Sequence, residues 1–359
     1  MRRITTYLTI VVAFVVGIVH VSAQELRLGV DFTTLFDNKE YAGMEFDESG
    51  TLFSARLTPK VGVVWAERNE LMFAVDMVQD FGHNSKFLSD INVQLYYAYR
   101  APQVKVLVGI FPRSEMRGLE TPLFFDRDYR YYHNRIGGVL ARYENPDWGD
   151  SFVEFAMDYT GMRDFDTREA FMIMSAGRMP IEWFYLGYDF MMGHYAKDYN
   201  PETTDGVVDN ILLTPYIGWD FSAGGFDVDL RLSYVQSLQR DRINEHRWIA
   251  PCGGEIYAAI GRWGVTLSNR LYMGGSLLTY YERYGNDLYH GMPFYATTKH
   301  IYDAITASYK HSFFADTVAV EAGITAEYDG TTWGTRQWLQ LSVDLDYGIS
   351  LKRKTHYIE

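Results

Sequence analysis

The stretch QWLQLSVDLDYGISLK, residues 337–352, decides the fold. Apolar side chains occupy seven alternate positions in it, with polar side chains or glycine between them: Leu339, Leu341, Val343, Leu345, Tyr347, Ile349 and Leu351. A β-strand has a side-chain period of two, whereas an α-helix has a period of 3.6. The stretch therefore predicts a long strand with one apolar and one polar face.

The same alternation recurs along the chain, for example over 91–100, 151–159, 225–238 and 317–328. Sixteen strands are predicted in this way, at about 25–36, 50–65, 69–79, 90–100, 103–111, 135–145, 151–160, 169–178, 181–195, 209–221, 225–238, 253–262, 264–274, 298–311, 316–328 and 336–352. The alternation is weaker over 169–178 and 253–262, so fourteen strands are the alternative.

The connections between these strands alternate in length. Long segments such as 80–89 and 112–134 are followed by short ones such as Ala101-Pro102 and Met179-Pro180. Transmembrane β-barrels have short periplasmic turns and long outer loops, whereas a soluble sandwich has no reason to sort its loops. In a bilayer every backbone group must be paired, so the sheet must close on itself. We predict an all-β fold, a transmembrane antiparallel up-and-down β-barrel of about sixteen strands, as a single domain over 24–359.

The first residues have the pattern of an export signal. Met1–Arg3 is cationic, Leu8–Val21 is an apolar run, and Val21-Ser22-Ala23 ends in a small residue suited to cleavage. A transmembrane helix needs about 20 apolar residues, so the short run disfavours the alternative of a membrane anchor. We expect residues 1–23 to be a cleaved signal peptide and the rest of the chain to reach the outer membrane.

Composition narrows the classes of function. With 33 Lys+Arg against 46 Asp+Glu, the net charge of −13 argues against nucleic-acid binding. The single Cys252 excludes an intrachain disulfide framework and a cysteine-rich metal site. His83-Asn84-Ser85 and Gly149-Asp150-Ser151 contain residue types found in hydrolases, but sequence neighbours do not make a spatial triad. We expect no catalytic residues, no metal, no cofactor and no enzymatic activity.

The signal peptide, the alternating strands and the sorted loops together resemble the porin-like outer-membrane β-barrels of diderm, Gram-negative bacteria. The resemblance is architectural and covers 24–359. It implies a channel for passive diffusion of small hydrophilic solutes, surrounded by outer-membrane lipid. The alternative is a non-conducting structural or accessory barrel in an outer-membrane assembly. Whether the barrel forms a homo-oligomer or joins another complex stays open.

The polar faces of the strands would line the lumen of such a barrel, because the apolar faces meet lipid. The early strands would contribute basic residues, namely Arg27, Arg56, Lys60, Arg100 and Lys105. The later strands would contribute acidic residues, namely Asp227, Asp229, Glu321, Glu327, Asp344 and Asp346. Sixteen strands are wide enough for an aqueous channel. The alternative is a plugged lumen in which these charges pair.

The third outer loop, 112–134, is the densest charged segment. Its candidate constriction residues are Arg113, Glu115, Arg117, Asp126, Arg127, Asp128 and Arg130. In the general porins that the chain resembles, the third outer loop folds inward and narrows the pore. Rings of arginine or of carboxylates are how pores select charge. We therefore expect a charge-filtering constriction here; the alternative is a solvated surface loop.

Overall fold

The computed structural model describes residues 25–351 except 46, 201–205 and 298. The predicted signal peptide lies outside these residues. Among them, no helix is long and apolar enough to cross a membrane.

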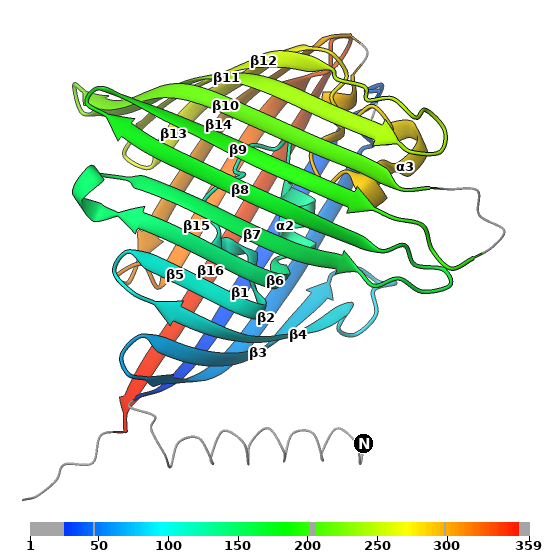
Figure 1. Cartoon of the computed structure of the whole chain (residues 1–359). Helices are drawn as coiled ribbons and strands as arrows, with labels where there is room; N and C mark the ends of the chain where they lie inside the picture. Colours follow the sequence, from blue (N-terminus) through cyan, green and yellow to red (C-terminus); the bar gives the residue numbers. More distant parts are fainter. Residues whose placement is uncertain (1–24, 46, 201–205, 298, 352–359) are drawn as a thin grey trace, which may run out of the picture.

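Sixteen antiparallel strands form a closed barrel (Figure 1). In chain order they are β1 Glu25–Glu40, β2 Gly50–Trp65, β3 Asn69–Asp80, β4 Asp90–Arg100, β5 Val104–Pro112, β6 Arg135–Asn145, β7 Ser151–Gly161, β8 Ala170–Ile181, β9 Phe184–Tyr195, β10 Val208–Ala223, β11 Phe226–Asp241, β12 Cys252–Arg262, β13 Val265–Gly274, β14 Ile301–Phe313, β15 Val318–Tyr328 and β16 Trp333–Ser350. Each strand pairs with the next, and β1 pairs with β16 from Glu25↔Ser350 to Glu40↔Thr335. The predicted fold is confirmed. The fourteen-strand alternative is wrong, because both weak stretches form strands, β8 and β12.

The two faces of the strands meet different surroundings. In β4, Ile91 and Leu95 are 55% and 51% exposed, whereas Gln94 and Tyr96 between and beside them are buried. An outward apolar band with an inward polar or aromatic face is the pattern of a strand between lipid and lumen. The period of two therefore sets the direction of each side chain.

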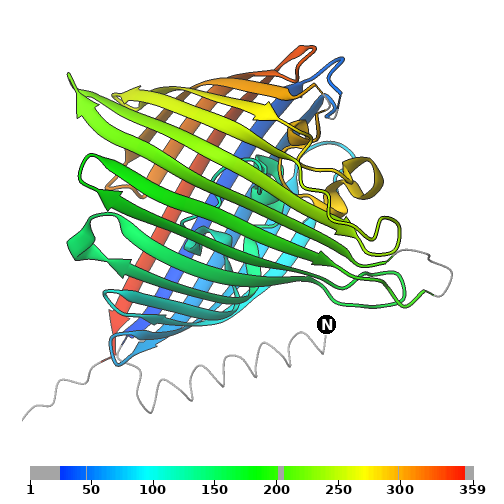
Figure 2. The ribbon, with the colours of Figure 1, turned by 45° about the horizontal axis from the view of Figure 1, so that its top comes forward.

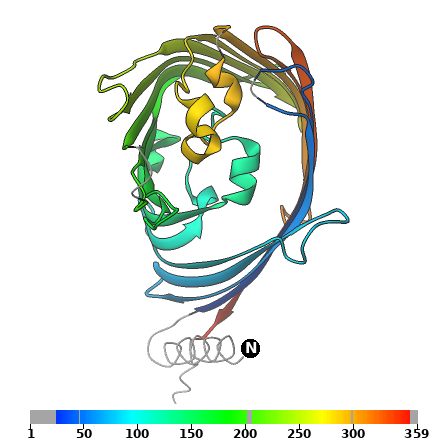
Figure 3. The same ribbon diagram turned by 90° about the vertical axis from the view of Figure 1, so that its right-hand side faces the viewer.

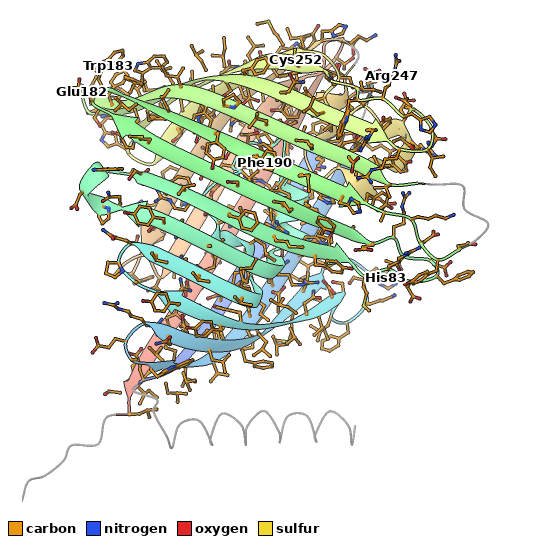
Figure 4. All side chains as sticks on the ribbon, in the orientation of Figure 1. His83, Glu182, Trp183, Phe190, Arg247 and Cys252 are labelled. Atoms are coloured by element: carbon orange, nitrogen blue, oxygen red, sulfur yellow. The ribbon has the colours of Figure 1, made fainter. Side chains whose placement is uncertain are left out.

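The connections are sorted between the two ends of the barrel. Glu182 and Trp183, which form one tight turn, lie at one end in Figure 4, whereas His83 and Arg247 of the longer loops lie at the other. Another tight turn, Trp263–Gly264, has φ values of 56° and 82°, as a type I′ hairpin turn requires. Short turns thus occupy one end and long loops the opposite end, as predicted. The predicted turn at Met179-Pro180 is wrong, because both residues pair with β9 within β8 and the chain turns at Glu182–Trp183.

Two of the long connections lie inside the ring of strands (Figure 3). The first carries the 3-10 helix η1 Arg113–Glu115 and the helix α2 Arg127–Tyr132. The second carries the helix α3 Tyr281–Leu288 and the 3-10 helix η3 Pro293–Ala296. A further 3-10 helix, η2 Pro146–Trp148, lies in a short turn. Figure 2 shows α3 near the end with the long loops. The main buried apolar cluster includes Phe124, Leu288 and Phe294, so the core lies within the lumen.

Candidate functional site in the barrel lumen

One wall of the barrel holds the start of loop 113–134 through buried carboxylates. The Nη2 of Arg113 donates to Asp158 on β7 at 2.6 Å. The backbone N–H groups of Arg117 and Gly118 donate to Glu154, also on β7, at 3.0 and 2.6 Å. These bonds add to those that Asp158 accepts from the Gly137 N–H and that Glu154 accepts from Arg142. A buried carboxylate needs such partners, because burying it unpaired costs several kcal/mol. The loop is therefore fixed to this wall by its backbone as well as by its side chains.

The far end of the same loop is held by the opposite side of the barrel. Asp128 in α2 accepts from Arg336 on β16 and pairs with Lys39 on β1, both at 2.8 Å. Arg127 lies 3.5 Å from Glu321 on β15. In the closed ring, β7 is roughly half a turn away from β15, β16 and β1. Loop 113–134 therefore crosses the lumen.

Internal contacts give the crossing loop a defined shape. Asp126 accepts a hydrogen bond from the backbone N–H of Tyr129 at 2.6 Å and caps α2. Arg130 donates to the carbonyl oxygens of Leu119 and Phe125. The loop is thus bonded to itself as well as to both walls.

An ion cluster lies at the base of the loop. Glu115 accepts from Arg100 on β4 and from Lys105 on β5, both at 2.7 Å. Burial by itself would raise the pKa of Glu115, but the two cations outweigh it and lower that pKa to about 2. The carboxylate therefore stays charged, and the cluster intact, at any pH the barrel would ordinarily meet.

A second loop packs onto the first. The His290 carbonyl accepts from the Asp126 N–H at 2.8 Å, and the Met292 N–H donates to the Pro122 carbonyl at 2.7 Å. The His290 ring stacks on Tyr129, with ring centroids 4.2 Å apart. A Cβ at Gly291 would lie 1.8 Å from the Leu123 carbonyl oxygen, so only glycine fits there. The inward-folded structure is built from two loops rather than one.

The inward position of loop 275–297 was not predicted from the sequence. A signal was present in the sequence: Leu277, Leu278, Leu288 and Phe294 are apolar residues in a long outer loop. All four are buried. An outer loop with this content would expose a large apolar surface if it stood in water.

Two cavities lie on either side of loop 113–134. The larger, of about 860 Å³, is lined by Arg113, Tyr129 and His133 and by outer-loop residues such as Thr167. The smaller, of about 330 Å³, is lined by residues 116–120 together with Asp150 in a short turn. The two linings share no residue. The loop therefore divides the lumen between the long-loop end and the short-turn end.

The predicted basic lumen residues each lie beside a carboxylate. Lys60 meets Asp31 and the predicted Asp346 at 2.8 and 3.1 Å, and lies 3.6 Å from the predicted Asp344. The other pairs are Arg27 with Glu70, Arg56 with Asp76, and Arg100 and Lys105 with Glu115. The basic and acidic groups thus meet where β16, β1 and β2 adjoin, and they partly neutralise each other there.

The remaining predicted acidic residues have polar partners as well. Asp229 accepts from Tyr185 at 2.8 Å, Asp227 from Ser222 at 2.5 Å and Glu321 from Trp338 at 3.3 Å. Glu327 is buried and accepts from Tyr41 and Tyr302. Their role as pore-lining groups stays a prediction.

The docking of the two loops should depend on pH through His290. Burial lowers the pKa of this imidazole from 6.5 to about 3, and Arg113 and His133 act in the same direction. A histidine that is harder to protonate in the docked state stabilises docking above pH 6.5. That stabilisation is lost as the pH falls from 6.5 toward 3, at about 1.4 kcal/mol per pH unit. We expect residues 275–297 to lose protection from hydrogen exchange between pH 7 and pH 4, after correction for intrinsic rates.

The matched control is His290→Phe, which keeps an aromatic ring against Tyr129 but cannot titrate. Its protection should vary much less over the same pH range. An identical pH dependence in His290→Phe and the parent protein would assign the effect to another group, such as Asp126, whose pKa burial raises.

Known structures share the barrel architecture. The chain is similar to the outer membrane protein opdK from Pseudomonas aeruginosa, with a TM-score of 0.53, 10% identity, and coverage of 90% of this chain and 99% of that one. It is also similar to a loop L8 deletion mutant of OmpT, an outer membrane protein of Vibrio cholerae, with a TM-score of 0.51, 11% identity, and coverage of 90% and 99%. No curated protein matches the chain. These likenesses support the outer-membrane porin type of barrel, at a level of identity that speaks for the fold alone.

A match to a protein-family model points to an enzyme family rather than to porins. Residues 18–196 match the family described as lipid A 3'-O-deacylase-type, which is an enzyme family. This match contradicts our expectation that the chain is not an enzyme. That expectation rested on finding no catalytic arrangement in the sequence, including the rejection of the two hydrolase-like triplets. In both triplets the serine is bonded to a nearby backbone carbonyl: the Ser85 hydroxyl donates to the Gly82 carbonyl, and the Ser151 hydroxyl to the Asn145 carbonyl. The match covers residues 18–196, which include both triplets.

Proposed function

We propose that the chain is an outer-membrane channel through which small hydrophilic solutes diffuse passively. The observation that carries the proposal is the crossing of a wide, closed barrel by loop 113–134, with a cavity on each side. A sixteen-strand barrel is too wide to be filled by wall side chains alone. Inward-folded loops are then what limits the size of a solute.

The charges of loop 113–134 supply the filter in this proposal. Arg113, Glu115, Arg117 and Asp128 each bond to a wall of the barrel, so their positions are fixed. Fixed charges in a narrow, poorly hydrated passage act on an ion more strongly than mobile charges in bulk water. The larger cavity is in the size range of sites that hold a small organic molecule.

Planar-bilayer recording of the folded protein tests the proposal. Discrete current steps are expected, and the reversal potential in a salt gradient gives the sign of the selectivity. The same protein after heat unfolding is the control, with folding checked by the mobility shift that β-barrels show on gels. A folded but silent barrel would contradict the channel and favour a non-conducting accessory subunit, to be sought through co-purifying partners.

A second candidate is removal of an acyl chain from lipid A, which the family match over 18–196 favours. Ester hydrolysis needs a general base and a group that stabilises the oxyanion. Within the matched and described residues, two histidines have suitable neighbours. His133 lines the larger cavity with Arg113 and Arg135, and His194 lies 3.9 Å from Asp209 near the outer end of the barrel.

The deacylase candidate is tested by incubating the protein with lipid A in vesicles and following released fatty acid by mass spectrometry. Release that disappears in His133→Gln or His194→Gln would identify the base. Release no faster than from vesicles without protein would remove this candidate. The bilayer recording is independent of this assay, because a barrel can conduct and hydrolyse.

A further inference from the structure

The Arg113 guanidinium is buried and incompletely bonded. Its side chain is only 7% exposed. Nε donates to the His133 carbonyl, and Nη2 donates to the Arg135 carbonyl, each at 3.0 Å, and Nη2 also donates to Asp158. Nη1 has no partner among the described residues and is shielded from solvent. One charged donor of a nine-tenths buried side chain is therefore unused, in a residue that lines the larger cavity.

Arg135, the first residue of β6, repeats this situation. It lines the same cavity, and its Nη1 is likewise shielded and without a partner among the described residues. Pro112 and Arg135 pair across β5 and β6, which brings the two arginines to the same place in the lumen. No ion pair joins the Arg135 guanidinium to a carboxylate in the part of the chain that the structure describes. Two arginines that line one cavity thus each carry a shielded guanidinium donor without a partner among the described residues.

Four carboxylates that line the cavity already have hydrogen-bond or ion-pair partners. Asp158 accepts from both Arg113 and the Gly137 N–H, and Asp128 pairs with Lys39 and Arg336. Asp47 also pairs with Lys39, and Asp126 caps α2. The other carboxylates of the cavity lie in the outer loops and in α3, at Asp166, Asp198 and Asp287. The shielded atoms without a partner beside the start of β6 are then Nη1 of Arg113, Nη1 of Arg135 and the amide oxygen Oδ1 of Asn134. Two of the three are donors of positively charged groups.

The electrostatic surroundings of His133 also indicate positive charge at this place. Burial lowers the pKa of His133, and the next two causes are the positive charges of Arg135 and Arg113. Burial, Arg113 and His133 likewise lower the pKa of His290, on the facing loop, so this imidazole also stays neutral. An anion entering this place would meet two guanidinium groups and two neutral imidazoles, beside the Asp158 carboxylate that pairs with Arg113.

We propose that the larger cavity binds the oxyanion of a small solute, a carboxylate or a phosphate, between Arg113 and Arg135. A buried donor without an acceptor costs about 1–3 kcal/mol, and more when it is charged, so an incoming acceptor recovers that cost. Guanidinium N–H groups match the geometry of carboxylate and phosphate oxygens. This inference rests on the proposed channel and specifies its solute class: small anions, held at a site on the outer side of loop 113–134.

Isothermal titration of the folded protein in detergent at low chloride tests the site. The probes are glucuronate and glucose 6-phosphate, with glucose as the neutral compound of the same ring. One or both anions should bind, and glucose should give no comparable heat. Binding of only one of the two would identify carboxylate or phosphate as the preferred group. Equal titrations with glucose and both anions would overturn the proposal.

Arg135→Gln is the decisive variant, because its guanidinium has no partner to lose among the described residues. We expect its anion affinity to fall at least tenfold, and Arg135→Lys to keep part of it. The matched control is Arg262→Gln, at the short-turn end of β12, where the guanidinium stacks on Phe226 and Trp263 away from the cavity. The gel-mobility shift confirms that each variant is folded. Unchanged affinity in folded Arg135→Gln would also overturn the proposal.

The titration separates this inference from the channel. A silent barrel that binds anions through Arg135 would remove the channel and keep the site. A conducting barrel that does not distinguish the anions from glucose would keep the channel and remove the site.

Discussion

Replacing residues 116–131 with a short Gly-Ser linker is expected to raise the single-channel conductance severalfold. This segment bonds to β7 and β9 at one end and to β15, β16 and β1 at the other, through Gly118, Leu119, Arg127 and Asp128. Its removal joins the two cavities that it now separates. The barrel should still form, because its closure depends on strand pairing and not on this loop. Planar-bilayer recording measures the change.

A matched control is the replacement of residues 82–87 with a linker of similar composition. This outer loop is exposed and carries His83 at the rim of the barrel (Figure 4). Its replacement should leave the conductance close to that of the parent protein. Equal conductance in all three proteins would mean that loop 113–134 does not limit the current.

The second large effect is expected from Arg336→Ala, which should lower the free energy of unfolding by about 3–5 kcal/mol. Arg336 is 7% exposed and donates twice to Asp37, at 2.7 and 2.8 Å, and once to Asp128, at 2.8 Å. Asp37 is 1% exposed, so the substitution leaves a buried carboxylate without its main partner. Reversible urea unfolding of the barrel in lipid vesicles measures the loss.

The double variant Asp37→Ala/Arg336→Ala should recover part of that stability, because it removes the unpaired charge together with its partner. Arg68→Ala, at an exposed turn, serves as the arginine control and should change the unfolding free energy by less than about 0.5 kcal/mol. A loss in Arg336→Ala no larger than that in Arg68→Ala would show that the buried pair contributes little. Since Arg336 also anchors Asp128, unsteady currents are expected from the same variant.

The expectation of no enzymatic activity was wrong for a physical reason. Catalytic groups are brought together by the fold, so a search for adjacent residues such as His83-Asn84-Ser85 tests only contiguous arrangements. The family likeness extends over 18–196, from the N-terminal segment to the end of β9. The histidines with charged neighbours in that region, His133 and His194, lie on different elements from their partners.

The amino-acid sequence by itself determined the barrel. Segments such as 337–352 alternate apolar and polar residues with a period of two, which specifies strands. In a bilayer such strands have no stable arrangement except a closed ring, because every backbone group must be paired. The alternation of long loops and short turns is also a property of the linear chain. Together the two patterns correctly predicted sixteen strands, although the apolar–polar alternation is weak over 169–178 and 253–262.

Only the tertiary structure decided what fills the lumen. The bond between Asp126 and His290 and the pairing of Lys60 with Asp346 join residues far apart in the sequence, and no local pattern specifies them. The same holds for Arg113 and Arg135, whose unused donors become visible only when every neighbouring acceptor has been assigned. The face of the sheet to which a side chain points depends on the alternation within a few residues of it, and can therefore be predicted from the sequence. Which charges inside the barrel stay without a partner depends on all the contacts of the folded chain, so only the tertiary structure reveals them.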